Sequence, residues 1–148
     1  MKALTLLMAG VMILLTCTTE TKKQPAQLDG TWEVVSWKRV RNDSIIYEFP
    51  GKITGSEMKI WSGNKFIFSG HYRRDTLEWD NCGGGTFTLE NDHYTENIQY
   101  FPNHEVIGNQ SKLILKMEGD TITQTWPADE DWQINKTFYN VQKLVKIK

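Results

Sequence analysis

The stretch from Gly83 to Phe101 reads GGGTFTLENDHYTENIQYF and decides the fold expected for the whole chain. It holds two runs in which polar and apolar residues alternate, a pattern typical of β-strands with one buried face. The runs are joined by Asn91-Asp92, two residue types that tolerate the left-handed backbone of a tight hairpin turn. A two-residue turn at this point pairs Leu89 with Tyr94, so the stretch predicts an antiparallel β-hairpin.

The two faces of this hairpin differ in polarity. Because side chains alternate along a strand, pairing Phe87 with Glu96 places one carboxylate on an otherwise apolar face. That face carries six side chains: Phe87, Leu89, Tyr94, Glu96, Ile98 and Tyr100. The other face is neutral and polar, which predicts a sheet with a core side and a water side. The three glycines at the start allow a bend or the close approach of another chain segment.

The length and composition suit one domain with a single core, at 148 residues. The net charge is −1, and the 17 lysines and arginines are interspersed with 18 acids rather than gathered into a stripe. This pattern lacks the basic footprint of a nucleic-acid-binding protein. Six tryptophans, six phenylalanines and five tyrosines favour a β-rich domain with a wide aromatic interior.

Residues 1–17 have the pattern of an export signal. A lysine precedes an apolar run from Ala3 to Leu15, which is too short to span a bilayer as a helix and suits a signal-peptide core. The run ends in Leu14-Leu15-Thr16-Cys17, which resembles a bacterial lipobox, although Thr16 stands where glycine or alanine is usual. We expect lipidation at Cys17. Ordinary secretion after a nearby small residue, and a hydrophobic N-terminus that stays in the cytoplasm, are the alternatives.

A lipid on Cys17 predicts a bacterial cell-envelope protein that touches the membrane only through its N-terminal anchor. Residues 18–27 are polar and predict a flexible tether, which leaves residues 28–148 as the folded domain. Cys82 is then the remaining thiol, so we expect no disulfide framework. Beside three glycines, Cys82 is interpreted as a small half-buried residue at a bend rather than a reactive thiol.

Further strands are predicted before the glycine stretch. Residues 29–40 form the first, and residues 58–61 pair with residues 65–70 across a Ser-Gly-Asn turn. Two shorter pieces are less clear from their pattern. Residues 45–50 form a strand stub or a single helical turn, and residues 76–80 form a short strand that leads into the glycines.

The C-terminal part of the chain predicts another hairpin and a last strand. Residues 112–118 and 121–126 pair across Gly119-Asp120, and residues 136–147 follow after an acidic loop. Pairing across the turn places one set of side chains together: Leu113, Leu115, Met117, Ile122, Gln124 and Trp126. This set is apolar apart from one amide, so it predicts a second core-facing surface.

Taken together, these hairpins predict a closed sheet. A meander of this many strands has two unpaired edges unless its first and last strands meet. A barrel of eight or more strands is wide enough to enclose one small ligand. We therefore predict an all-β fold, an antiparallel up-and-down β-barrel of eight to ten strands.

Several motifs resemble the lipocalins and the wider calycin group. Gly30-Thr31-Trp32 is similar to their Gly-x-Trp signature at the start of the first strand. Three further runs are similar to the bacterial lipocalin-like domain found in exported proteins: residues 65–66, 84–89 and 94–101. The resemblance extends from about Leu28 to the C-terminus. It implies a barrel with a central cavity, like that of lipocalins and fatty-acid-binding proteins, and brings no catalytic residues.

The resemblance also implies how one end of the barrel is closed. In the calycin group the tryptophan of the signature plugs one end, and a basic residue of the last strand lies over its ring. Trp32 takes the first role, and Lys143, or alternatively Lys146, takes the second.

Glu96 is the residue whose role decides between two interpretations. A carboxylate on a core face needs a partner, and Arg73, a tyrosine or Gln124 could satisfy it as a purely structural group. Alternatively Glu96 orients a ligand, because pockets combine apolar walls with a few placed polar groups. The expected cavity-lining residues are then Phe87, Tyr94, Glu96, Tyr100, Met117, Gln124, Trp126 and Arg73.

The sequence favours a binding role over catalysis. The histidines lie on separate segments without metal-ligand spacing, and no nucleophile–base set stands out, so we expect no enzyme activity, metal site or cofactor. The first hypothesis is an exported lipocalin-like protein that binds a small apolar or amphipathic ligand inside the barrel. The alternative is an envelope interaction protein whose barrel is filled by its own side chains.

Overall fold

The computed structural model describes residues 27–148 as an all-β domain. The expected signal peptide, the lipidation site Cys17 and nearly all of the tether lie outside these residues. The described segment holds nine strands and one short 3-10 turn, η1 at His104–Val106. The strands are β1 Gly30–Arg41, β2 Ser44–Phe49, β3 Thr54–Ser62, β4 Lys65–Arg74, β5 Leu77–Glu90, β6 His93–Tyr100, β7 Gln110–Glu118, β8 Thr121–Trp126 and β9 Phe138–Lys146. No helix among residues 27–148 has the length and apolar character needed to cross a membrane.

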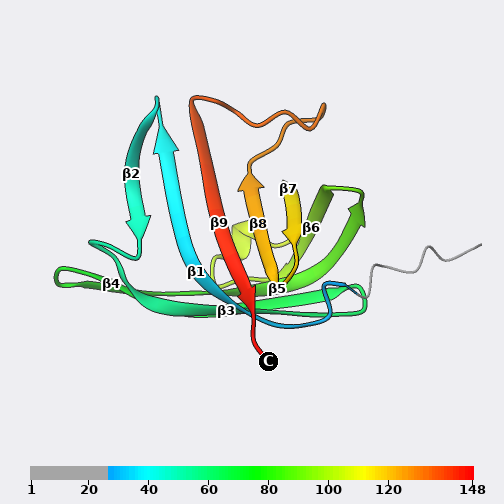
Figure 1. Cartoon of the computed structure of the whole chain (residues 1–148), viewed down its shortest axis with the longest axis horizontal. Helices are drawn as coiled ribbons and strands as arrows, with labels where there is room; N and C mark the ends of the chain where they lie inside the picture. Colours follow the sequence, from blue (N-terminus) through cyan, green and yellow to red (C-terminus); the bar gives the residue numbers. More distant parts are fainter. Residues whose placement is uncertain (1–26) are drawn as a thin grey trace, which may run out of the picture.

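The sheet closes on itself, which confirms the predicted fold class. Each strand from β3 to β8 pairs antiparallel with the next along the chain, and β1 pairs with both β3 and β9. Eight strands therefore form a closed barrel, and β2 is an extra strand on the outer part of β1 (Figure 1). Residues 45–50 were left open by the pattern between a strand and a helical turn; residues 45–49 belong to this extra strand, and Pro50 begins the turn after it. Residues 76–80 are not a separate strand, because β5 continues through them.

The barrel wall forks along β1. One edge of β1 pairs with β9. The other edge has two partners: its first residues, Gly30–Glu33, pair with β3, and its last residues, Trp37–Arg41, pair with β2. Only Met58–Trp61 of β3 therefore reach β1, and Thr54–Glu57 diverge from it. Figure 1 shows β2 beside the upper part of β1, while β3 and β4 run across the bottom of the view. This fork leaves one end of the barrel wider than the other.

The central hairpin has the register expected from its sequence. Phe87 lies opposite Glu96 and Leu89 opposite Tyr94, across the two-residue turn between β5 and β6. Phe87, Tyr94 and Glu96 are all buried. The alternation of side chains alone was therefore enough to place the carboxylate on the core face.

One residue of the predicted core face is exposed, because the register shifts at the glycines. A β-bulge lies between Gly84 and Gly85, and a bulge adds one residue and reverses the alternation beyond it. Tyr100 is consequently 67% exposed, and the ring of Phe101 takes the inner position against Phe68, with 6.5 Å between ring centroids. A Cβ atom on Gly85 would lie 1.9 Å from the Asn97 carbonyl oxygen, so this position accepts only glycine. Tyr100 is thus wrongly predicted to line the interior.

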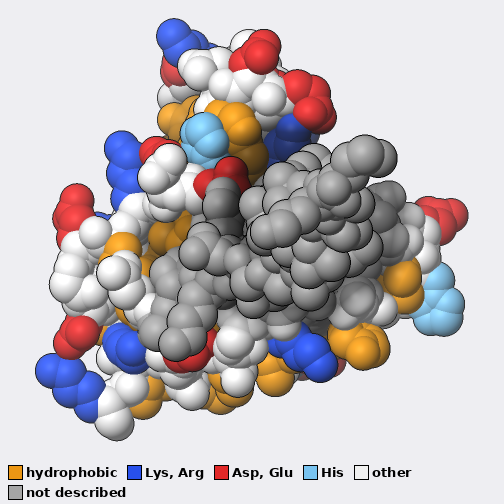
Figure 2. Space-filling model, turned by 90° about the vertical axis from the view of Figure 1, so that its right-hand side faces the viewer, with side chains coloured by type: hydrophobic (Ala, Val, Ile, Leu, Met, Phe, Trp, Pro, Cys, Tyr) orange, Lys and Arg blue, Asp and Glu red, His pale blue; other side chains and the backbone are white. Residues whose placement is uncertain are grey.

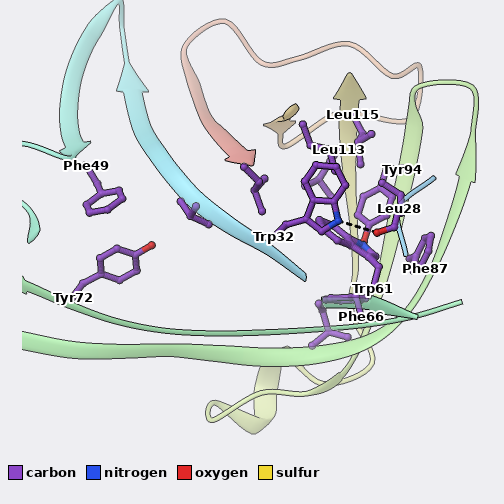
Figure 3. Close-up of a cluster of buried hydrophobic side chains, with 14 of the residues drawn as sticks. Leu28, Trp32, Phe49, Trp61, Phe66, Tyr72, Phe87, Tyr94, Leu113 and Leu115 are labelled. Atoms are coloured by element: carbon purple, nitrogen blue, oxygen red, sulfur yellow. Dashed lines mark hydrogen bonds between the residues drawn. The ribbon is translucent and has the colours of Figure 1, made fainter. Parts of the chain in front are cut away.

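The narrow end of the barrel is filled by large side chains. Trp32 is fully buried, and its indole N–H donates a hydrogen bond of 2.9 Å to the Leu28 carbonyl oxygen. Its ring meets that of Trp61 edge to face at 6.1 Å, and the Trp61 N–H donates to the Tyr94 hydroxyl at 2.8 Å. Figure 3 shows this group gathered at one end, with Phe49 and Tyr72 set apart from it.

The basic residue over Trp32 is Lys146, whose ammonium lies 5.3 Å from the ring centroid. Lys143, the expected residue, is exposed instead. The buried side chains of β9 are Asn140, Gln142 and Leu144, so the odd-numbered Lys143 points outward by alternation. Lys146 packs near the strand end, where Gly30 leaves room: a Cβ there would lie 3.0 Å from the lysine Cε. With this end plugged, the closed antiparallel barrel fits a lipocalin-like fold.

Candidate functional site

A cavity of about 460 Å³ occupies the wide end of the barrel, at the fork between β2 and β3. Its wall includes residues of β1, β2 and β3 together with residues from the far side of the barrel. Leu77, at the rim, is 57% exposed, which shows that the cavity opens to solvent there. Six aromatic side chains line it: Trp37, Tyr47, Phe68, Tyr72, Trp79 and Trp126.

Glu96 lies in the cavity wall and forms a buried ion pair with Lys59. Lys59 is 4% exposed and Glu96 is 7% exposed, so both charges are removed from water. The ammonium also lies over aromatic rings, 5.1 Å from the centroids of Trp61 and Phe66. The pair joins β3 to β6 across the interior, and each charge satisfies the other.

Glu57, two residues before Lys59 on β3, is a second buried carboxylate in the cavity wall. It accepts hydrogen bonds from three neutral donors: Asn81 Nδ2 at 2.6 Å, Gln142 Nε2 at 3.0 Å and the Tyr72 hydroxyl at 3.3 Å. Three donors at one carboxyl group suit its ionised form, which only accepts. No lysine or arginine of residues 27–148 forms an ion pair with it.

Gln124 carries the one buried side-chain polar atom without a partner in residues 27–148. Its Oε1 accepts a long hydrogen bond of 3.4 Å from the Lys59 ammonium. Its Nε2 then donates to no atom of the described segment, although Gln124 is 1% exposed. A buried donor without an acceptor lowers the free energy of unfolding by about 1–3 kcal/mol, and the Gln124 amide is such a donor.

Two arginines stand at the wide end among aromatic rings. The Arg39 guanidinium lies 5.4 Å from the Trp37 ring and 5.5 Å from the Tyr47 ring, and its Nε donates to Asn140 Oδ1 at 2.9 Å. The Arg74 guanidinium lies 5.0 Å from the centroid of the same Tyr47 ring. Both side chains are half-buried, so the rim is basic while the depth of the cavity holds the carboxylates.

Two tyrosines next to these carboxylates are held in the protonated form. Burial, the charge of Glu57 and the hydrogen bond to it raise the pKa of Tyr72 well above its ordinary value. Burial, followed by the charge of Glu96, likewise raises the pKa of Tyr94. Each phenol therefore acts as a neutral hydrogen-bonding group rather than as an acid near neutral pH.

These pKa directions predict a loss of stability at alkaline pH. The unfolded tyrosines ionise at about pH 10, whereas Tyr72 and Tyr94 hold their protons in the folded protein. The free energy of unfolding is therefore expected to fall above about pH 10, by about 1.4 kcal/mol per pH unit for each. Tyrosinate absorbance measured against pH checks this. Tyr72→Phe is expected to flatten the slope, and full ionisation of all five tyrosines before unfolding would contradict it.

The outer surface carries charges of both signs. On the described part of the face in Figure 2, basic and acidic side chains are scattered among neutral ones. No group of three or more histidine, cysteine, aspartate or glutamate side chains in residues 27–148 is arranged to hold a metal ion. The interior is therefore the most distinctive chemical environment of the described segment.

The predicted cavity residues divide into three groups. Glu96, Gln124 and Trp126 line the cavity. Phe87 and Tyr94 are buried but belong to the narrow end, because Tyr94 packs against Trp61 and Phe87 packs against Tyr94. Met117 is half-buried and also packs against the core away from the cavity. The error arose because one face of a hairpin spans the full barrel length, and the cavity occupies only one end.

Arg73 was also predicted to line the cavity, and this prediction is wrong. Arg73 is exposed, and Arg74 lines the cavity in its place. Tyr72 is buried, so alternation along β4 turns Tyr72 and Arg74 inward and Arg73 outward. The partner of Glu96 is accordingly Lys59 rather than an arginine.

Sequence reasoning missed Glu57 and Lys59, because the residues that alternate with them, Met58 and Ile60, are apolar. The pattern therefore indicates that Met58 and Ile60, and not the two charged residues, face the core. Met58 is in fact 48% exposed. A signal was present in the hairpin turn: Trp61 lies opposite Phe66, so the aromatic face of β4 continues along β3 through Lys59 and Glu57. Following that pairing would have turned both charges inward.

Comparisons with protein-family models and with curated proteins find no match to this chain.

Proposed function

We propose that this domain binds one small amphipathic molecule in the cavity at the wide end of the barrel, without catalysis. The observation that carries the proposal is the cavity itself, about 460 Å³ in volume and lined by six aromatic rings and two buried carboxylates. Ligand sites commonly have volumes of about 300–1,000 Å³ and combine apolar walls with a few oriented polar groups. Both features are present at this end of the barrel.

The unpaired amide of Gln124 supports the same proposal. A buried donor normally finds a partner in the folded protein or in a bound molecule. Gln124 lines the cavity, and its Nε2 is the atom that lacks one among residues 27–148. The Nε2 atom is itself buried, so a ligand with an acceptor oxygen would remove the cost of the unpaired donor only after the amide turns toward the cavity.

The alternative hypothesis, a barrel filled by its own side chains, fits only the narrow end. Trp32, Trp61 and Tyr94 pack together at that end, and each is at most 1% exposed. At the wide end the same aromatic types stand around open space, because β2 and β3 diverge. The observations therefore favour ligand binding over a purely structural role.

A cavity-filling variant tests the proposal. Ser111 is half-buried in the cavity wall, whereas Ser69 is exposed on the outside of β4. The neutral dye N-phenyl-1-naphthylamine fluoresces strongly in apolar surroundings and serves as a probe of the cavity. We expect Ser111→Phe to weaken dye binding about tenfold or more, by occupying the space the dye needs, and Ser69→Phe to leave it unchanged.

Circular dichroism would verify that both variants fold. Equal dye binding by wild type and Ser111→Phe would show that the dye sits elsewhere, and the absence of dye binding to the wild type would leave the cavity without a demonstrated ligand. Either result would count against the binding proposal.

We further propose that the protein is exported and anchored by a lipid on Cys17. The support lies in residues 1–17, where an apolar run ends in a lipobox-like sequence. Labelling bacterial cells that express the protein with radioactive palmitate is expected to mark the wild type and not Cys17→Ser. Equal labelling of both, or of neither, would contradict the anchor.

A further inference from the structure

Glu57 is a buried negative charge without a positive partner in residues 27–148. Its carboxylate is satisfied by hydrogen bonds from an asparagine, a glutamine and a tyrosine, all of which are neutral. A carboxylate has about four lone-pair sites, and three are used. Oε2 accepts two of the hydrogen bonds and Oε1 accepts one, so Oε1 retains capacity for another donor.

The buried charges of the cavity do not cancel. Glu57, Lys59 and Glu96 are each less than 9% exposed and line the same cavity. Lys59 is bound to Glu96, so the net charge of this buried group is −1. A net charge in a poorly hydrated site is expensive, and a ligand of opposite charge lowers that cost.

Aromatic rings stand beside this charge. Tyr72, which donates to Glu57, stacks against Trp79 with 5.7 Å between centroids, and lies 6.4 Å from Trp37. The faces of such rings attract organic cations. A carboxylate within a group of aromatic rings is a combination that suits an ammonium group attached to an apolar body.

We propose that the ligand is an amphipathic organic amine whose ammonium group binds Glu57. This inference rests on the proposed function and names the chemical class of the molecule bound. The ammonium donates to the Glu57 carboxylate, and the apolar body lies among Trp37, Tyr72 and Trp79.

The arginines at the rim do not reverse this preference. Neither arginine forms an ion pair with Glu57 in residues 27–148. The Arg39 side chain donates to Asn140 Oδ1, the Arg74 guanidinium lies over the Tyr47 ring, and both arginines are half-buried at the rim. Glu57 is 4% exposed, so its charge acts in a less polar environment and dominates inside the cavity.

Three ligands with the same indole ring and two-carbon linker test the charge directly. Tryptamine is cationic at neutral pH, tryptophol is neutral and indole-3-propionate is anionic. By calorimetry on the purified full-length protein, we expect tryptamine to bind about tenfold more tightly than tryptophol, and indole-3-propionate to bind most weakly.

A matched pair of variants locates the charge responsible. Glu57→Gln keeps the size of the side chain and removes the buried charge, whereas Glu78→Gln removes the same charge from an exposed position on β5 next to Trp79. We expect Glu57→Gln to weaken tryptamine binding about tenfold and to leave tryptophol within about twofold. Glu78→Gln is expected to change neither.

Equal binding of tryptamine and tryptophol, tighter binding of indole-3-propionate, or an unchanged tryptamine affinity in Glu57→Gln would overturn the inference. If Glu57→Gln does not fold, the order of the three ligands on the wild type still decides. The neutral dye separates the two proposals: dye binding that depends on the cavity, without a preference for tryptamine, refutes the amine alone. Loss of dye binding together with all three indoles refutes both.

Discussion

Replacing Lys59 by methionine is expected to lower the free energy of unfolding by about 3–5 kcal/mol. Lys59 is the buried cation that pairs with Glu96 and approaches Gln124, and its removal leaves Glu96 charged, buried and without an ionic partner. Methionine keeps the apolar length of the side chain, so the loss reports the charge rather than a cavity. Chemical denaturation followed by circular dichroism measures it.

A double variant provides the control for this prediction. In Lys59→Met/Glu96→Gln both buried charges of the pair are gone, so the double variant is expected to be more stable than Lys59→Met alone. A Lys59→Met protein with wild-type stability would show that the pair contributes nothing. A double variant less stable than the single one would show that Glu96 does not need Lys59.

Replacing Trp32 by alanine is expected to cost about 3–5 kcal/mol, because it empties a large volume at the closed end of the barrel. Trp32 is fully buried, contacts Trp61 edge to face and donates to the Leu28 carbonyl oxygen. Thermal and chemical denaturation measure the loss. A cost below about 1 kcal/mol would show that this tryptophan does not hold the narrow end together.

The two lysines of β9 separate the cation–π contact from the packing of the ring. Lys146→Met removes the ammonium 5.3 Å from the Trp32 ring and is expected to cost about 0.5–1 kcal/mol. Lys143→Met, at an exposed position on the same strand, is expected to be nearly neutral. Equal effects of the two substitutions would indicate a general loss of surface charge rather than a specific contact.

The two ends of the barrel explain why one interior has two kinds of environment. At the narrow end β1 pairs with both β3 and β9, which brings Trp32 and Trp61 together and excludes water. At the wide end β3 has left β1 and space opens beside Glu57 and Lys59. The buried charges of Glu57, Lys59 and Glu96 thus lie at the end where the barrel is open.

The sequence by itself determined most of the strands, the register of the central hairpin beside its turn, and the position of Glu96 on the core face. These features depend on the alternation of side chains and on turn residues, which act between neighbours in the chain. The same local rule also placed Gln124 inside the barrel, since Leu115 and Gln124 lie opposite one another across a tight turn.

Only the tertiary structure decided which end of the barrel is hollow and which charges meet inside it. Lys59 and Glu96 are 37 residues apart and sit on strands that do not pair with each other, so no local pattern relates them. Tyr100 and Lys143 were misplaced for a related reason. A bulge at Gly84 and Gly85, and the direction in which β9 closes onto β1, are set by packing across the whole barrel rather than by neighbouring residues.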